Sequence, residues 1–198
     1  LIGLIWRFLA IVALGMAVQF VFRKLTEGTR SRLETGPDDE AMAARAFRFA
    51  GRTMMLYLNA LAYAVGAYGA YVALPMAAPG GAVLLVGATS FFVAKLILAT
   101  ARVFLSPGVS GLRPGGMGDE TAHYLYIWVR RLVRIFVYAL FLLEAMRLVG
   151  LPAPAYDSLV YLTGFVLAGV LVVVVLQNRA SVAAAIRGSG GDSLAGGA

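Results

Sequence analysis

Residues 121–151, TAHYLYIWVRRLVRIFVYALFLLEAMRLVGL, decide the fold class of this chain. The stretch begins with polar and aromatic residues, passes through Arg130, Arg131 and Arg134, and then runs apolar almost to Pro152. Positions three and four apart share one side of a helix, so the three arginines lie together. The 17 residues between Arg134 and Pro152 approach the minimum for crossing ~30 Å of hydrocarbon at ~1.5 Å per residue. This pattern predicts a membrane helix entered from a basic side.

Aromatic residues precede the arginine cluster. Tyr124, Tyr126 and Trp128 lie where an aromatic belt at the bilayer surface is expected. We therefore predict that these aromatic residues and the three arginines anchor the chain to anionic lipid headgroups on the cytoplasmic side. A voltage sensor is the alternative, but it needs arginines that continue every third position into the membrane. Val137 and Leu140 occupy those positions here.

The composition is that of an all-α integral membrane protein. Of the 198 residues, 61% are hydrophobic and 14% are charged, against about 45–50% and 25% in a soluble domain. The apolar runs are long and continuous, which excludes the alternating pattern of a β-barrel. The net charge of +7 does not indicate nucleic-acid binding, because the basic residues lie at the ends of apolar runs. The chain has no cysteine, so it has no disulfide and no thiolate metal site.

The apolar runs predict about five transmembrane helices, arranged as one helix followed by two tandem helical hairpins. The expected segments are a first helix at 1–22, a basic and amphipathic cytoplasmic linker at 23–52, a hairpin at 53–105, a cytoplasmic loop at 106–120, a second hairpin at 121–177 and a flexible cytoplasmic tail at 178–198. Within the linker, residues 40–52 are expected to lie on the membrane surface before the chain turns into the bilayer. Because the chain begins inside an apolar run and ends in a Gly-rich tract, we interpret it as a fragment of a longer protein.

An internal repeat supports this arrangement. Each hairpin begins with a basic residue, turns at a proline and ends with a basic residue. In the first hairpin, Arg52 lies 23 positions before Pro75, and in the second, Arg130 lies 22 positions before Pro152. In both hairpins the basic residue at the end lies 27 positions after the proline. The two hairpins therefore have the same orientation. Their turns, at 75–81 and 152–155, carry no charge. The positive-inside bias places these turns outside, with residue 1 outside and residue 198 inside a bacterial inner membrane.

Four polar residues inside the predicted spans are candidate functional residues. Lys95 lies near the middle of its helix, where a buried ammonium indicates a functional site. Otherwise Lys95 extends to the inner face or pairs with Asn59 or another helix. Glu144 and Arg147 are three positions apart near the outer side, so we expect a local pair with a structural role.

Other polar motifs point to no chemistry. His123 is the only histidine and lies near Asp119 and Glu120, but this spacing matches no metal-ligand set. An interfacial or capping role is expected for it. The sequence has no GxSxG, HExxH or phosphate-binding loop. We therefore predict no enzyme, no cofactor and no metal site.

Small residues recur at intervals of four in two of the predicted helices. They are Ala62, Gly66 and Ala70 in one helix, and Gly164 and Ala168 in another. Such spacing lets two helix backbones approach closely. It predicts packing between helices rather than a binding site.

Two stretches of the chain resemble the bacterial small-conductance mechanosensitive channel superfamily, in its longer members with extra helices before the pore. They are GDETAHYLYIWVRRLVRIFVYALFLLEAMRLVGLP at 118–152 and LQNRASVAAAIRG at 176–188. The resemblance implies a homo-oligomer, a heptamer in that family, that releases ions and small solutes on osmotic downshock. The family's pore helix is rich in Gly and Ala, whereas residues 156–176 are rich in Leu and Val. This chain then corresponds to the peripheral, lipid-facing and tension-sensing region, and no pore residue is carried over.

Two other functions stay open. One is a subunit of a helical secondary transporter, in which Lys95 and Asn59 contribute to a site at the membrane midplane. Against it, no predicted helix is interrupted at its centre by paired Gly or Pro, as discontinuous transporter helices are. The other is a membrane scaffold that conducts nothing.

Overall fold

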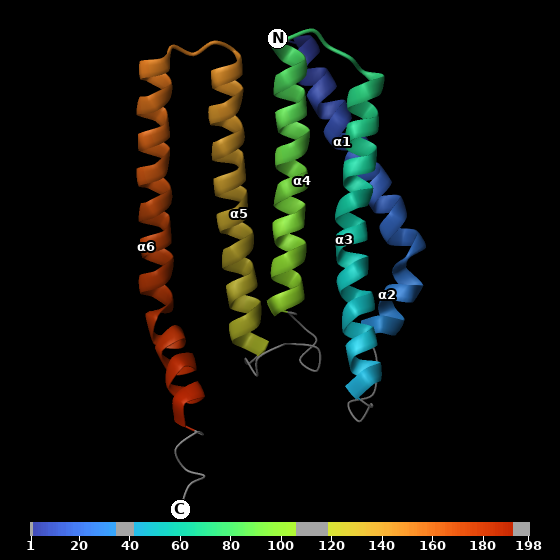
Figure 1. The fold of residues 1–198 in the computed structure, drawn as a ribbon, viewed down its shortest axis with the longest axis vertical. Coiled ribbons are helices and arrows are strands. Elements are labelled where there is room, and N and C mark those ends of the chain that lie inside the picture. Colours follow the sequence, from blue (N-terminus) through green and yellow to red (C-terminus); the bar gives the residue numbers. More distant parts are fainter. Residues whose placement is uncertain (1, 35–41, 106–118, 192–198) are drawn as a thin grey trace, which may run out of the picture.

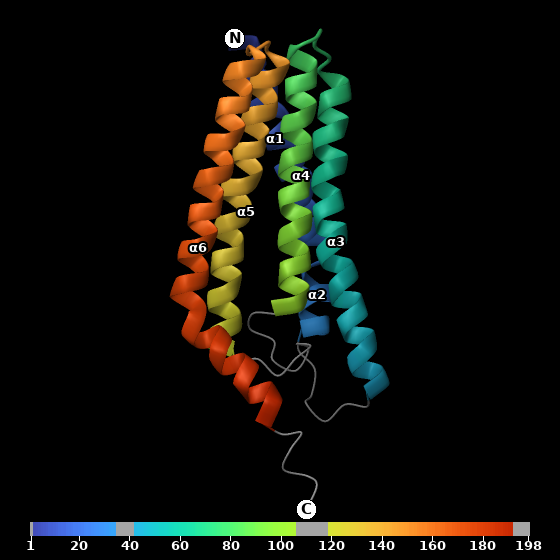
Figure 2. The same ribbon diagram turned by 60° about the vertical axis from the view of Figure 1, so that its left-hand side comes forward.

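The computed structural model describes residues 2–34, 42–105 and 119–191, and every regular element in these ranges is a helix. The helices are α1 (Ile2–Leu25), α2 (Glu27–Glu34), α3 (Met42–Ala73), α4 (Gly80–Leu105), α5 (Asp119–Leu148) and α6 (Ala153–Gly191). Helices α3 to α6 stand side by side in a row, and α1 crosses one face of α3 and α4 (Figure 1 and Figure 2). The result is a bundle elongated along its helix axes.

The two ends of the bundle differ in chemistry. The hairpin turns at residues 74–79 and 149–152 lie at the same end as the start of α1 (Figure 1), and we call it the turn end. At the opposite end α1 finishes with Arg23 and Lys24, and α4 finishes with Arg102. We call this the basic end. The hairpins α3–α4 and α5–α6 therefore point in the same direction.

Two backbone hydrogen bonds close the C-terminal end of α5, where the chain turns toward α6. The Gly150 N–H donates to the Arg147 carbonyl and the Leu151 N–H donates to the Met146 carbonyl, both at 3.1 Å. Gly150 has φ +97°, a conformation that costs glycine little because it has no Cβ. This pattern closes the last turn of a helix without leaving its carbonyl groups unpaired. The chain can therefore reverse directly into α6.

Helices α1, α3 and α4 pack into a three-helix bundle. Its core contains Ile11 from α1, Tyr63 from α3 and Leu84 from α4, all fully buried. Two hydrogen bonds between side-chain hydroxyls also join α3 to α4, one between Tyr57 and Thr100 at 2.9 Å and one between Tyr68 and Thr89 at 3.0 Å. Hydrogen bonds of this kind add to van der Waals packing where no water competes.

Glycines bring α1 and α3 into close contact. A Cβ added to Gly66 would lie 2.8 Å from the Leu14 carbonyl oxygen, and one added to Gly15 would lie 2.6 Å from the Tyr63 ring. Ala62 and Ala70, which share the predicted small-residue face with Gly66, are buried. This face therefore packs against a neighbouring helix.

The second small-residue face meets no neighbouring helix among the described residues, so the packing expected for it stays a prediction. Gly164 and Ala168 lie on α6 and are exposed, and a Cβ added to Gly164 would meet no atom within 4 Å. The reason is that, among the described residues, α5 is the only helix with which α6 makes extensive contact. Most of the α6 side chains that the structure describes are consequently exposed.

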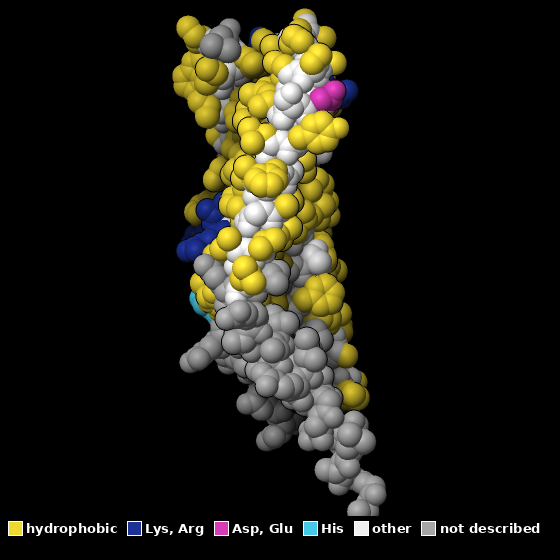
Figure 3. Space-filling model, turned by 90° about the vertical axis from the view of Figure 1, so that its left-hand side faces the viewer, with side chains coloured by type: hydrophobic (Ala, Val, Ile, Leu, Met, Phe, Trp, Pro, Cys, Tyr) yellow, Lys and Arg dark blue, Asp and Glu magenta, His cyan; other side chains and the backbone are white. Residues whose placement is uncertain are grey.

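The α5–α6 hairpin attaches to the bundle through α5. Ala94 of α4 packs with Val133 and Val137 of α5 in a small buried cluster. Of the α6 side chains that the structure describes, only Leu167 is buried, while large apolar residues such as Tyr161 and Phe165 are about four-fifths exposed at 78% and 80%. Figure 3 faces α6 and shows a largely apolar surface with a patch of basic side chains to one side. This hairpin is thus an apolar surface standing beside the three-helix bundle.

Within the described ranges, three helices are long and apolar enough to cross a membrane: α1, α4 and the Ala153–Val173 part of α6. This identifies a helical membrane protein. Helices α3 and α5, at 32 and 30 residues, have the length for a span but lower hydropathy. Tyrosines and Asn59 lower it in α3, and α1 and α4 cover part of that helix. Charged residues lower it in α5.

Two boundaries differ from the sequence predictions. Helix α3 runs without a break from Met42 to Ala73, so residues 42–52 continue the following helix and do not form a separate surface helix. Helix α6 continues to Gly191, well past the exit predicted at residue 177. In both cases polarity marks where a membrane would end, whereas the residues on either side are good enough helix formers to continue the backbone hydrogen bonds. Of the loop predicted at 106–120, residues 106–118 lie outside the described residues, and Asp119 and Glu120 begin α5.

Candidate functional site: a polar cavity between three helices

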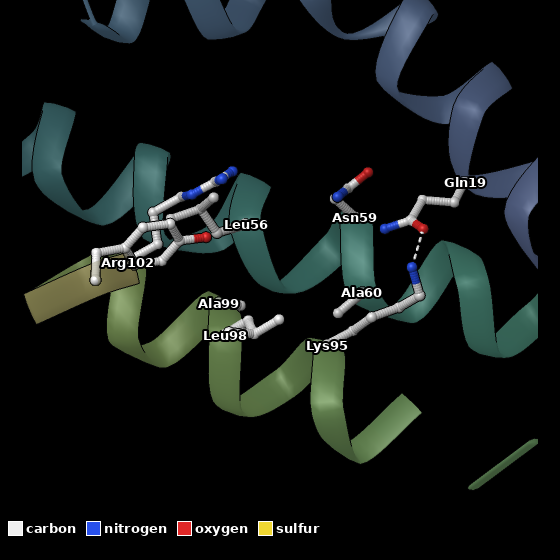
Figure 4. Close-up of a pocket in the computed structure, with 9 residues that line it drawn as sticks. Gln19, Leu56, Asn59, Ala60, Lys95, Leu98, Ala99 and Arg102 are labelled. Carbon is white, nitrogen blue, oxygen red and sulfur yellow. Dashed lines mark hydrogen bonds between the residues drawn. The ribbon is translucent and has the colours of Figure 1, made fainter. Parts of the chain in front are cut away.

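A polar cavity lies between α1, α3 and α4, in the half of the molecule nearer the basic end, and Tyr126 of α5 contributes to its wall. Its volume is about 160 Å³, and its polar lining residues are Gln19, Asn59, Lys95, Arg102 and Tyr126. Figure 4 shows Lys95 and Gln19 pointing toward each other from separate helices, with Asn59 beside them. Arg102 lies at the other end of the lining, beyond the apolar Ala60 and Leu98. Lys95 is ten positions from the end of α4, which places its backbone roughly 15 Å from that end at ~1.5 Å per residue.

Lys95 is held by α1 and α3. Its Nζ donates a hydrogen bond of 2.5 Å to Gln19 Oε1 (Figure 4). The same nitrogen lies 4.6 Å from the centroid of the Tyr63 ring, within the range of a cation–π contact. An ammonium removed from water needs such partners, because burial of an unpaired charge is costly. Lys95 therefore has one hydrogen-bond acceptor and one aromatic ring as partners within the bundle.

Of the alternatives that the sequence left open for Lys95, the structure shows pairing with another helix, through Gln19 of α1 rather than through Asn59. Asn59 lines the same cavity, but its Oδ1 is buried without a hydrogen-bond partner among the described residues. The Tyr63 hydroxyl is likewise buried and unpaired within the described part of the chain. Sequence reasoning missed Gln19, although it is the only amide in the apolar run of residues 1–22. A single polar side chain in a membrane helix is the signal that points to it.

Arg102 and Tyr126 form the part of the cavity wall nearest the basic end. The Arg102 Cζ lies 5.3 Å from the centroid of the Tyr126 ring. Tyr126 is only 8% exposed, which corrects its predicted role as a surface anchor. Tyr126 is two positions from both Tyr124 and Trp128, so it points to a different side of α5, toward α4.

The other predicted anchors remain on the surface. Tyr124 and Trp128 pack edge to face with ring centroids 6.2 Å apart, and Arg131 Cζ lies 5.4 Å from the Trp128 ring centroid. Arg130, Arg131 and Arg134 are all exposed. These five residues form one aromatic and basic surface on α5, separate from the cavity.

The remaining candidates lie away from both places. Glu144 and Arg147 pair on α5, with Arg147 Nε donating to Glu144 Oε2 at 2.9 Å and a second, shorter contact from the Arg147 Nη2 to Glu144 Oε1. His123 is exposed. The side chains of its predicted neighbours, Asp119 and Glu120, lie outside those that the structure describes. Within the described ranges, no group of three or more His, Asp and Glu residues is placed to hold a metal ion.

No protein-family model matches the chain, and comparison with curated proteins and with solved structures finds no match.

Proposed function

We propose that this chain is the peripheral, lipid-facing and tension-sensing region of a mechanosensitive ion channel that releases solutes on osmotic downshock. The observation that carries the proposal is the α5–α6 hairpin. It stands beside a packed three-helix bundle and exposes apolar side chains along α6. The resemblance of residues 118–152 and 176–188 to the mechanosensitive channel superfamily supports the same function.

The α6 surface is suited to contact lipid. Its exposed large apolar residues include Leu162, Phe165, Val166, Leu171 and Val172. In water, a continuous apolar surface of this kind promotes association, whereas in a bilayer the lipid tails cover it. A ligand or a force shifts a conformational equilibrium only when it interacts differently with the two states. A hairpin with a wide lipid contact supplies such a difference when the bilayer thins or spreads.

Five membrane spans are part of this proposal. Helices α3 and α5 run alongside α4 and α6 (Figure 1) and have the length to cross a membrane with them. The turn end then lies outside and the basic end lies in the cytoplasm of a bacterial inner membrane, as the positive-inside bias favours. The exposed surface formed by Tyr124, Trp128, Arg130, Arg131 and Arg134 would contact anionic headgroups there.

The pore is assigned to another part of the assembly. The superfamily is homo-oligomeric with a Gly/Ala-rich pore helix, and α6 up to Val173 is instead rich in Leu and Val. The exposed α6 and the contact of α5 with α4 fit a peripheral position around such a pore. Ions and small solutes would then pass elsewhere, and this region would transmit membrane tension.

Patch-clamp recording from liposomes tests the proposal, with the chain in its full-length protein and suction stepped at fixed voltage. We expect openings whose probability rises with tension and depends little on voltage. The double variant Phe165→Asn and Val172→Asn should raise the tension for opening, because it weakens the lipid contact of α6. The matched substitution Val72→Asn, on an exposed position of α3, should change the threshold less. Silence at near-lytic tension would contradict the channel function and would make transport through Lys95 the next hypothesis to test.

A further inference from the structure

Four aromatic rings join α5 to the three-helix bundle in the half of the molecule nearer the turn end. The rings of Phe8 on α1 and Phe141 on α5 are stacked, with centroids 5.7 Å apart and planes 5° from parallel. The ring centroid of Phe91 on α4 lies 6.1 Å from that of Phe8 and 5.5 Å from that of Tyr138 on α5. Tyr138 and Phe141 are three positions apart and so share one side of α5. We call these four residues the aromatic cluster.

A glycine makes the stack possible. Gly87 is buried on α4, beneath the rings of Phe8 and Phe141. A Cβ added to Gly87 would overlap the Phe8 ring at Cε2 and would lie 3.2 Å from Phe141 Cε2. Among the described residues, α1 and α5 share no extensive contact. The stack is therefore a local link between these two helices, and it depends on the missing side chain at position 87.

The other side of the contact between α4 and α5 is a groove. Its volume is about 310 Å³, and its lining includes Leu85, Val86, Thr89 and Val93 of α4 with Val137 and Leu140 of α5. Val93 is two positions from Phe91 and from Lys95, which both contact α1. At 3.6 residues per turn, Val93 lies on the opposite side of α4. Helix α4 has the length and hydropathy of a membrane span, so we expect lipid tails to border this groove.

Between the aromatic cluster and the basic end, α5 rests on a small buried contact. Ala94 of α4 packs there with Val133 and Val137 of α5. Packed helices can slide or tilt by small amounts on such a contact. Protein interiors are packed as densely as organic crystals, so a helix moves more easily toward a groove than into a filled core. Helix α5 is therefore held on its α1 side by the aromatic cluster and borders open space on the other side.

We propose that the aromatic cluster is a latch that holds α5 beside α1 in the resting state, and that its release lets α5 tilt toward the groove. This inference rests on the proposed function, because it names the contact that regulates movement of the α5–α6 hairpin under tension. A contact made in only one of two states shifts the equilibrium between them. One aromatic pair corresponds to roughly a two- to tenfold change in such an equilibrium.

Distances between spin labels in the reconstituted full-length protein test the latch. The reporting pair is Leu9→Cys on α1 with Leu142→Cys on α5, both at exposed positions next to the stack. Phe141→Leu removes one ring but keeps an apolar side chain, and Gly87→Ala separates the two rings without removing either. The matched control is Phe104→Leu, which removes an exposed ring near the basic end of α4. We expect both latch variants to raise the ratio of longer to shorter distances roughly two- to tenfold, and the control to leave it unchanged.

Patch-clamp recording of the same variants tests the regulation. Phe141→Leu and Gly87→Ala should lower the opening tension, and Phe104→Leu should match the unmodified protein. Unshifted distances in both latch variants would overturn the latch, and shifted distances with an unchanged opening tension would overturn its regulatory role. Silence of the unmodified protein at near-lytic tension would refute the proposed function instead, and the distances alone would then decide whether the stack holds α5. If either latch variant does not fold, Phe8→Leu breaks the same stack from α1.

Discussion

The Lys95 ammonium and the Gln19 amide join α4 to α1 by a hydrogen bond between Nζ and Oε1 of 2.5 Å. The two residues are 76 positions apart in the sequence. A hydrogen bond to a charged group contributes about 1.5–3 kcal/mol, and loss of one partner leaves the other unpaired in a partly buried place. This contact therefore makes the α1–α4 packing depend on two polar residues within apolar helices.

A double-mutant cycle on this pair is the first prediction. Gln19→Leu and Lys95→Met should each lower the free energy of unfolding in detergent, and the double variant should lose less than the sum of the two. We expect a coupling energy of about 1–2 kcal/mol. The cycle of Lys95→Met with Asn59→Leu is the control and should be closer to additive. Stronger coupling to Asn59 than to Gln19 would show that the ammonium has the other partner.

Two glycines on α3 give a matched pair for the second prediction. Gly66→Ala should destabilise the protein by about 1–3 kcal/mol, because the added methyl group meets the backbone of α1 at Leu14 and Gly15. Gly69→Ala should leave stability unchanged or raise it slightly, because that position has no neighbour within 4 Å and alanine favours a helix. Thermal unfolding in detergent measures both. Equal effects at the two positions would contradict the close α1–α3 contact.

An aromatic contact near the turn end links the hairpin to the bundle, and it gives the third prediction. The rings of Phe8 on α1 and Phe141 on α5 are stacked, with centroids 5.7 Å apart and planes 5° from parallel. Phe141→Ala should reduce the free energy of unfolding by about 1–3 kcal/mol through lost packing and stacking. Phe165→Ala on the exposed face of α6 should change it by less than about 0.5 kcal/mol. A larger effect of Phe165→Ala than of Phe141→Ala would contradict this prediction and would mean that α6 packs against another polypeptide chain.

Membrane topology is the fourth prediction, and the absence of cysteine from the chain makes it direct to measure. Ala77→Cys and Ala153→Cys, at the two turns, should react with a membrane-impermeant maleimide in intact cells. Ser31→Cys on α2 should react only after the membrane is permeabilised. If Ala77→Cys reacts in intact cells and Ala153→Cys does not, then the α5–α6 hairpin does not span the membrane.

The sequence predicted the helical membrane class, and the helices begin and end near the predicted turns. Prolines, glycines and uncharged turns mark the ends of these helices, so the sequence alone is enough to predict them. The continuity of α3 was not predicted, because Arg45, Arg48 and Arg52 mark a membrane boundary but do not interrupt helical hydrogen bonds. The five spans, the orientation and the channel function remain predictions.

The candidate site was predictable only in part. Lys95 and Asn59 stand out because they are polar residues in apolar runs. Their spatial relation to Gln19, Arg102 and Tyr126 was not predictable, because it depends on how α1 crosses α3 and α4 and on which side of α5 packs inward. Tyr126 illustrates this. Its sequence neighbours place it in an aromatic belt, whereas the contact with Arg102 places it in the cavity wall.

The proposed function requires that the α5–α6 hairpin move against the three-helix bundle when membrane tension rises. Distances between spin labels in reconstituted protein, before and after addition of lysophosphatidylcholine to one leaflet, test it most directly. The reporting pair is Val72→Cys on α3 with Tyr161→Cys on α6, and the control pair is Val72→Cys with Leu9→Cys on α1, all at exposed positions. We predict that the Val72–Tyr161 distance distribution shifts while the Val72–Leu9 distribution stays the same. Two unchanged distributions, or two that shift together, would contradict the claim.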